Sequence, residues 1–229
     1  MKKSRGKKIG TIISFVVFFA AFWLISCQNR RCNFCDDSVP NWGECLGTVS
    51  FITDRTWIVG NQEWSDAVTA TNCNKETFNS VRIPHSREKR NFFADCRSNG
   101  DYGDLFSWCA VVRFKDILCP DDWRVPTRRD FIILDRALGG TGRNRRDIDH
   151  PTGYVISKYV NYWGASFGGS TGSENAVRHR GEKAYYWTQS KRCEFAGYGF
   201  RLWEGVDVIS PRRSSNKGFG KTLRCVRNI

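Results

Sequence analysis

Arginine is the residue type in this chain best placed to bind a ligand, because it recurs in clusters between the patterned segments. Such basic clusters attract acidic glycans, lipid phosphates or an acidic partner protein. The alternative is that they are solvated loop residues that keep the domain soluble. The candidate binding residues are Arg143, Arg145, Arg146, Arg178, Arg180, Arg212 and Arg213.

Residues that could support catalysis are scarce. The histidines are His85, His150 and His179, and none of them lies in a recognisable motif. The sequence contains neither a serine nucleophile elbow nor a His-Glu-x-x-His pair. We therefore predict a protein without catalytic residues and without a cofactor.

The cysteines predict disulfides, because a high cysteine density is typical of exported proteins. The short-spaced pair Cys32 and Cys35 has no matching histidines or second Cys-x-x-Cys, so no zinc site is predicted. Nine cysteines remain after Cys27, so at least one thiol is unpaired or shared with a partner. Spacing alone assigns no pairing to Cys32, Cys35, Cys45, Cys73, Cys96, Cys109 or Cys193.

The N-terminus has the pattern of a lipoprotein signal peptide. A basic start over residues 2–8 is followed by an uncharged apolar run from Ile9 to Ser26. Leu24-Ile25-Ser26-Cys27 resembles the lipobox of bacterial lipoproteins. We expect residues 1–26 to be the signal peptide, Cys27 to be lipidated, and residues 27–47 to form a tether; an uncleaved membrane anchor is the alternative.

The predicted location is the cell envelope, with a lipid anchor in the membrane. Gln28 is not the aspartate that retains some lipoproteins in the inner membrane, which favours the outer membrane. Removal of five basic residues with the signal peptide lowers the formal net charge from +13 to +8. The mature chain stays basic, but it lacks a nucleic-acid-binding motif, so we expect no nucleic-acid partner.

The remaining residues, 48–229, predict one α+β domain with an antiparallel sheet. Val49–Ile52 and Thr56–Val59 have the pattern of strands and are followed by a turn at Gly60-Asn61, whereas residues 62–103 suggest irregular structure. Asp104 is expected to cap a buried helix over 105–117, which Pro120 prevents from continuing.

A second helix is predicted to begin at Thr127-Arg128-Arg129-Asp130, a sequence similar to a capping box, and to end at Gly139-Gly140. Beyond it, basic glycine-rich loops alternate with short aromatic strands at 185–188, 198–203 and 222–226. The Arg212-Arg213 pair is expected to lie in a turn between two of these strands.

Six motifs, read in order, resemble the Fibrobacter succinogenes major paralogous domain, a domain common on bacterial lipoproteins. The motifs are GNQEWSDAV (60–68), YGDLFSWCAVV (102–112), CPDDWRVPT (119–127), LGGTG (138–142), YYWTQ (185–189) and GKTLRCVR (220–227). The resemblance implies a C-type-lectin-like fold, with two helices packed on a small twisted antiparallel sheet with long loops. It also implies a disulfide between Cys119, beside a helix, and Cys225, on the last strand.

The lectin-like resemblance leaves two ways of binding sugar. Calcium-dependent binding needs six to eight oxygen ligands, and Ser173-Glu174-Asn175 with Thr188-Gln189 supplies too few, so no metal is expected. The other way is a platform of exposed aromatic rings, for which Trp163, Trp187 and Trp203 are the candidates; burial of these three rings in the core is the alternative.

We therefore expect a non-catalytic binding or adhesion module for glycan or protein, which uses the loops between Gly140 and Gly181 and the Arg212-Arg213 turn. The second hypothesis is a structural subunit that docks an envelope protein through its basic face. A formylglycine-generating-enzyme-like activity is less favoured, because fold analogy alone supports it.

Overall fold

The computed structural model describes residues 46–74, 96–146, 154–172, 176–204 and 208–229, which all belong to one compact unit spanning residues 33–229. The predicted signal peptide, Cys27 and most of the predicted tether lie outside the described residues. Within these ranges no helix has the length and apolar character needed to cross a membrane.

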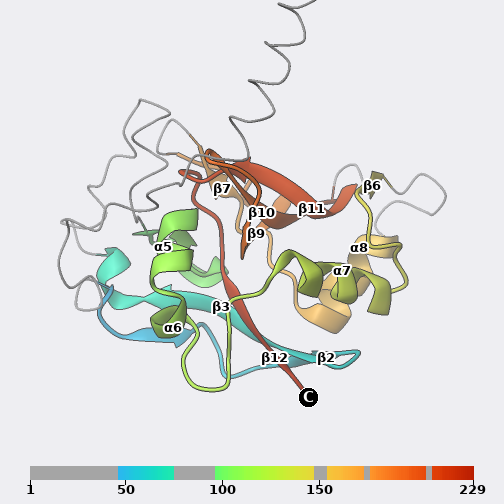
Figure 1. Cartoon of the computed structure of the whole chain (residues 1–229), viewed down its shortest axis with the longest axis horizontal. Coiled ribbons are helices and arrows are strands. Elements are labelled where there is room, and N and C mark those ends of the chain that lie inside the picture. The colour runs from blue at the N-terminus through green and yellow to red at the C-terminus, as the bar shows by residue number, and fades with distance from the viewer. Residues whose placement is uncertain (1–45, 75–95, 147–153, 173–175, 205–207) are drawn as a thin grey trace, which may run out of the picture. The chain divides into compact units, whose positions relative to one another are not determined.

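The first sheet is antiparallel and is built around β3 (Gln62–Ala70). Strands β1 (Val49–Phe51) and β2 (Trp57–Val59) pair with β3, and β12 (Arg224–Asn228) pairs with it as well, with Val226 opposite Trp64. Figure 1 shows β12 running beside β3 from a region far along the chain. The predicted strands before residue 60 and the turn after them are confirmed.

The second sheet is also antiparallel and has the order β6-β11-β10-β9. Two short ladders accompany it, β4 (Cys96–Arg97) with β5 (Leu105–Phe106) and β7 (Ser170–Thr171) with β8 (Val177–Arg178). The α+β prediction is thus confirmed. The four strands of the sheet are β6 (Arg145–Arg146), β9 (Lys183–Lys191), β10 (Ala196–Trp203) and β11 (Val208–Asn216).

The α-helices of the described ranges are α5 (Trp108–Arg113), α6 (Lys115–Leu118), α7 (Arg128–Ala137) and α8 (Tyr154–Trp163), with 3-10 turns at Thr71–Asn74 and Gly100–Tyr102. The predicted capping box of α7 is confirmed, because the Thr127 side chain accepts from the Asp130 N–H while the Asp130 carboxylate accepts from the Thr127 N–H. Such reciprocal bonds satisfy two N–H groups that a helix start otherwise leaves unpaired.

The predicted helix over 105–117 is wrong at its start. Leu105 and Phe106 form β5, and Phe106 exchanges two backbone hydrogen bonds with Lys221. Ser107, not Asp104, is the cap, since its Oγ accepts from the Ala110 N–H at 3.2 Å. Asp104 instead accepts from the Ala70 N–H at 2.8 Å, which ties it to β3.

Three other elements correct the sequence-based expectations. Residues 62–70, expected to be irregular, form the central strand β3. The loop region after Gly140 contains the ten-residue helix α8. Arg212 and Arg213 lie in strand β11 and not in a turn.

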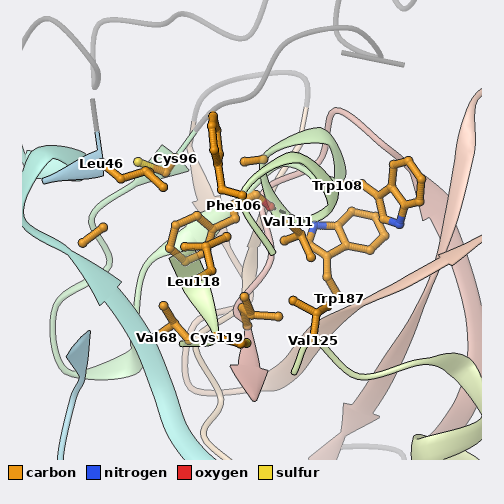
Figure 2. Packing of buried hydrophobic residues seen from close by; sticks show 14 of the residues in the cluster. Leu46, Val68, Cys96, Phe106, Trp108, Val111, Leu118, Cys119, Val125 and Trp187 are labelled. Carbon is orange, nitrogen blue, oxygen red and sulfur yellow. Dashed lines mark hydrogen bonds between the residues drawn. The ribbon is translucent and has the colours of Figure 1, made fainter. Parts of the chain in front are cut away.

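Two hydrophobic clusters fill the interior and share strand β9. Tyr186 packs with Phe131 of α7 and Tyr159 of α8, whereas Trp187 packs with the cluster around α5. Neighbouring residues of a strand point to opposite faces, so the two clusters lie on opposite sides of β9. Figure 2 shows Trp187 beside Trp108 in the α5 cluster.

The predicted disulfide between Cys119 and Cys225 is present, with a Cα–Cα distance of 5.6 Å. It joins the segment after α6 to β12. A second disulfide links Cys73 to Cys96, a pairing that the sequence left open. Cys109 and Cys193 take part in neither disulfide.

Candidate anion-binding site

A basic cavity of about 330 Å³ lies at one end of the second sheet. We call it the arginine pocket. Four of its lining side chains are arginines, and they come from three separate parts of the chain: the start of α7, the β9–β10 connection and β11. Its lining residues are Arg128, Asn144, Arg192, Tyr198, Arg212, Arg213 and Ser214.

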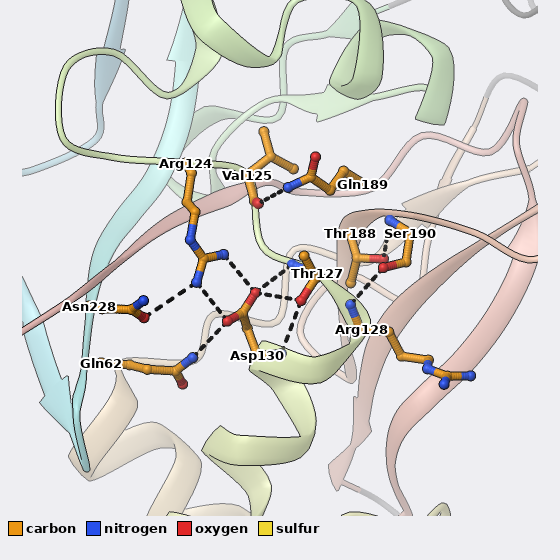
Figure 3. Close-up of polar contacts among 10 residues, drawn as sticks. All are labelled: Gln62, Arg124, Val125, Thr127, Arg128, Asp130, Thr188, Gln189, Ser190 and Asn228. Atoms are coloured by element: carbon orange, nitrogen blue, oxygen red, sulfur yellow. Dashed lines mark hydrogen bonds and ion pairs between the residues drawn. The ribbon is translucent and has the colours of Figure 1, made fainter.

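The capping box of α7 places Arg128 at the first position of the helix. The Arg128 N–H donates to Ser190 Oγ at 2.9 Å, which fixes the helix start against β9. The Arg128 guanidinium lies 4.7 Å from the centre of the Tyr198 ring, a cation–π distance. Figure 3 shows this side chain pointing away from the Arg124–Asp130 contacts.

The opposite wall is held by polar contacts around β11. The Arg192 guanidinium donates to Ser214 Oγ. The Arg212 N–H donates to Asn144 Oδ1 at 3.0 Å, so the residue just before β6 is fixed to β11. These contacts hold the lining side chains in place through hydroxyl and amide groups, and none of them uses a carboxylate.

The pocket carries a strong excess of positive charge. Among the described residues no ion pair joins Arg128, Arg192, Arg212 or Arg213 to a carboxylate. Guanidinium groups stay protonated and match carboxylate, sulfate and phosphate groups through paired N–H donors. The arrangement therefore suits an anionic ligand.

A partly buried ion pair supports the start of α7 from the other side. Arg124 donates to both oxygens of Asp130, at 2.7 and 2.8 Å, and Gln62 Nε2 donates to the same carboxylate at 2.9 Å. Burial opposes ionisation of Asp130, but the bonds from Arg124 and Thr127 outweigh it, so the pKa of Asp130 is lowered. Figure 3 shows these contacts converging on one carboxylate.

We expect Asp130→Asn to lower the free energy of unfolding at pH 7 by about 2–4 kcal/mol, because it removes charged hydrogen bonds at a largely buried position. The lowered folded-state pKa means that the carboxylate stabilises the protein above its unfolded pKa, near 4, and that this stabilisation is lost as the pH falls through the folded value. Urea unfolding at pH 7, 5 and 3 should show the wild type and the variant converging at low pH. A constant difference across this range would contradict the assignment.

The structure gathers only some of the predicted binding arginines. Arg212 and Arg213 line the pocket, and Arg143 precedes the lining residue Asn144. The strand Arg145–Arg146 pairs with β11 through its backbone. Arg178 and Arg180 lie away from the pocket on and after β8, where Arg180 donates to Asn99 and lies 5.8 Å from the Tyr102 ring centre.

Trp163 is not an exposed platform. It is fully buried, with ring centres of Tyr186 and Phe200 at 5.0 and 5.5 Å, so it presents no face to a ligand. The alternative, that Trp163 belongs to the core, is correct. Its position at the last residue of α8 places it against the sheet.

Sequence reasoning missed Arg128, Arg192 and Tyr198. The sequence marks Arg128 only as part of the capping motif, and Arg192 is a single arginine beside a cysteine rather than part of a cluster. The capping box was the one usable signal, because it places the residue after Thr127 at a helix start. In the described ranges no group of three or more His, Cys, Asp or Glu residues is arranged to hold a metal.

The fold and the site together define a disulfide-linked α+β domain with a basic pocket beside a helix start. The family model of the Fibrobacter succinogenes major domain matches residues 52–227, and the chain belongs to this family. No curated protein and no solved structure matches the chain.

Proposed function

We propose that this protein binds an acidic glycan, without catalysing a reaction, through the arginine pocket. The observation that carries the proposal is the convergence of four arginines from three parts of the chain on one cavity. A volume near 330 Å³ lies at the small end of ligand sites, roughly 300–1,000 Å³, and suits one acidic sugar unit.

The lining residues favour binding over chemistry. Arginine does not exchange protons at neutral pH, so four of the lining side chains supply charge and hydrogen bonds but no acid or base. His179, the one histidine in the described ranges, bonds to Glu182 and does not line the pocket. Tyr198 offers an amphipathic ring that can contact both a sugar and a cation.

The proposal includes an envelope lipoprotein, anchored through Cys27 and facing an outer-membrane ligand, and a C-type-lectin-like arrangement of the domain. The basic start, the apolar run and the Leu-Ile-Ser-Cys sequence support the anchor. The disulfide from the segment after α6 to β12 supports the lectin-like comparison. Replacing Cys27 by Ser should abolish labelling by palmitate, and continued labelling would remove the anchor from the proposal.

The central test is the variant Arg128→Gln/Arg212→Gln. We expect it to weaken binding of a sulfated disaccharide by roughly tenfold, since each screened charge contact contributes up to about 1 kcal/mol. Calorimetric titration of the full chain in a non-ionic detergent measures the affinity. Wild-type affinity should also fall as salt rises, because ions screen exposed charges.

The matched control is Arg97→Gln, which removes the same charge from an exposed residue of β4 that does not line the pocket. It should bind like the wild type. Equal affinity of the pocket variant and this control would refute the pocket as the binding site. A chelator should leave binding unchanged, and loss of binding on chelation would instead point to a calcium-dependent site.

A further inference from the structure

A second group of basic side chains lies on the face of the β9–β10–β11 sheet that points away from α7. Phe200 and Tyr186 face α7, as the 4.9 Å stacking of Phe200 on Phe131 shows. Residues one step along the strands face the other way. There Arg201 pairs with Tyr185, and Trp203 pairs with Lys183. We call this face the basic strip: Lys183, Tyr185, Arg201, Trp203, Arg213 and Lys221.

Lys221 crosses beneath the exposed part of the strip and is 1% exposed. Its Nζ lies 3.9 Å from the Trp187 ring centre and donates to Ser215 Oγ at 2.8 Å, so the side chain spans from β9 to β11. Gly199 makes this possible, because a Cβ there would meet the Tyr186 carbonyl oxygen at 2.5 Å and Lys221 Nζ at 3.2 Å.

The cations of the strip repel one another. Burial lowers the pKa of Lys221 well below its usual value, and the charges of Arg213 and Arg201 lower it further. Burial, followed by the charge of Arg213, also lowers the pKa of Arg201. No ion pair within the described ranges joins Arg201, Arg213 or Lys221 to a carboxylate. The Arg201 side chain bonds to the Tyr185 side chain, and its Nε is buried without a hydrogen-bond partner in these ranges.

The strip meets the arginine pocket at Arg213, around the edge of β11. Tyr198 of the pocket lies on the α7 side of the sheet, beneath Arg128, whereas Arg213 is opposite Gly199, whose neighbours Tyr198 and Phe200 face α7. Within the described ranges β6 pairs with β11 only at Val208 and Ile209, so a ligand can pass around this edge at Arg213.

Arg213 lines the pocket and is also the neighbouring charge that acts on Arg201 and Lys221. It lies opposite Gly199, four residues along β10 from Trp203. At about 3.3 Å per residue, this separation is roughly 13 Å, the length of a short oligosaccharide.

The strip also presents aromatic rings among its charges. Trp203 is partly exposed and Lys183 Nζ lies 3.7 Å from its ring centre, while Tyr185 is partly exposed beside Arg201. Aromatic faces pack against apolar surfaces and still tolerate water, which suits the C–H faces of sugar rings. A bare anion such as phosphate makes no use of these rings.

We propose that the basic strip is a second subsite and that the ligand is an anionic polysaccharide, which continues from the arginine pocket over Arg213 and Arg201 to Trp203. This inference rests on the proposed function, because one end or branch of the polysaccharide must occupy the arginine pocket before the rest of the ligand can reach the strip. The polysaccharide supplies the negative charge that the strip lacks, and its rings lie against Trp203 and Tyr185.

The test compares ligands of different length and chemistry on the full chain in a non-ionic detergent. Dextran sulfate oligomers of graded length probe charge with sugar rings, a sulfated disaccharide probes the pocket alone, and inorganic polyphosphate probes charge without rings. Wild type should bind long oligomers more tightly than the disaccharide. Thermal unfolding of each variant checks that it folds.

Arg201→Gln should weaken binding of the long oligomers by roughly fivefold, because it removes one screened charge contact. It should leave binding of the disaccharide unaffected. Arg201→Lys keeps the charge and should restore most of the affinity. Trp203→Leu should weaken dextran sulfate by roughly threefold to tenfold without weakening polyphosphate, as expected for loss of an aromatic contact.

The outcomes separate the two proposals. If Arg201→Gln leaves long-oligomer binding unchanged while Arg128→Gln/Arg212→Gln still weakens the disaccharide, the strip is not a subsite and the pocket stands. If the pocket variant leaves the disaccharide unaffected, the proposed function fails. Equal effects of Trp203→Leu on dextran sulfate and polyphosphate would overturn the sugar-stacking part, and no binding by any oligomer would overturn both proposals.

Discussion

Replacing Cys119 and Cys225 by alanine is expected to lower the free energy of unfolding by about 4–5 kcal/mol, the upper figure that the chain-entropy model gives for a loop of about 100 residues. The two cysteines are 106 residues apart and both are buried. A loss of this size approaches the whole stability of a small domain, about 5–15 kcal/mol. Urea unfolding of both proteins under the same non-reducing conditions measures it.

The second disulfide provides the matched control. Cys73 and Cys96 are only 23 residues apart, so Cys73→Ala/Cys96→Ala should cost less, about 3 kcal/mol in the same model. A larger loss for this pair than for Cys119 and Cys225 would contradict the loop-length argument. A free thiol at Cys119 or Cys225 in the folded wild type, found by peptide mapping, would contradict the pairing itself.

Trp163→Ala is expected to lower the free energy of unfolding by about 3–5 kcal/mol, because it removes a large side chain from a packed interior. Trp163 contacts the rings of Trp64, Phe131, Tyr186 and Phe200, with ring-centre distances of 5.0–5.9 Å. The Arg224 guanidinium also lies 4.5 Å from the Trp163 ring. Thermal or urea unfolding gives the change.

Trp163→Phe keeps an aromatic ring in the same space and should recover much of the loss. Below its unfolding transition, Trp163→Ala should bind the sulfated disaccharide like the wild type, because the residue lies outside the arginine pocket. Normal stability of Trp163→Ala would contradict the assignment of Trp163 to the packed core.

The parts of the fold that the sequence predicted well depend on local signals. The start of α7 was predictable because Thr127 and Asp130 satisfy each other's backbone groups within one helical turn. The turn after β2 was predictable because glycine readily adopts the positive φ that such turns need, and Gly60 has a φ of +64°. The pairing of Cys119 with Cys225 came from the family resemblance, since spacing alone permits many pairings.

Strand β3 was missed because its buried polar residues find partners far away in the sequence. Ser65 Oγ accepts from the Cys225 N–H at 2.9 Å, and Gln62 Nε2 donates to Asp130 at 2.9 Å. These residues give the segment a polar composition that resembles a loop. The burial pattern is also not a simple alternation, because β3 is covered on both faces by other elements.

The arginine pocket was only partly predictable for a similar reason. Arg212 and Arg213 stand out as a basic pair, but Arg128 and Arg192 reach the same cavity only through the packing of α7 on the sheet and the course of the β9–β10 hairpin. Sequence clustering finds charges that are neighbours along the chain. It does not find charges that are neighbours in space.

The pairing of β12 with β3 has a consequence for the order of folding. Of the three strands that pair with β3, β12 follows every other strand of the described chain. The Arg224 side chain of β12 donates to the Ser65 carbonyl oxygen, 159 positions earlier in the sequence. Because the chain is made and, as we propose, exported from its N-terminal end, β3 emerges before β12, and one edge of β3 has no native neighbour until β12 arrives. Because contacts between distant residues form slowly and unpaired strand edges tend to associate, we expect this edge of β3 to favour self-association until residues 224–228 pair with it.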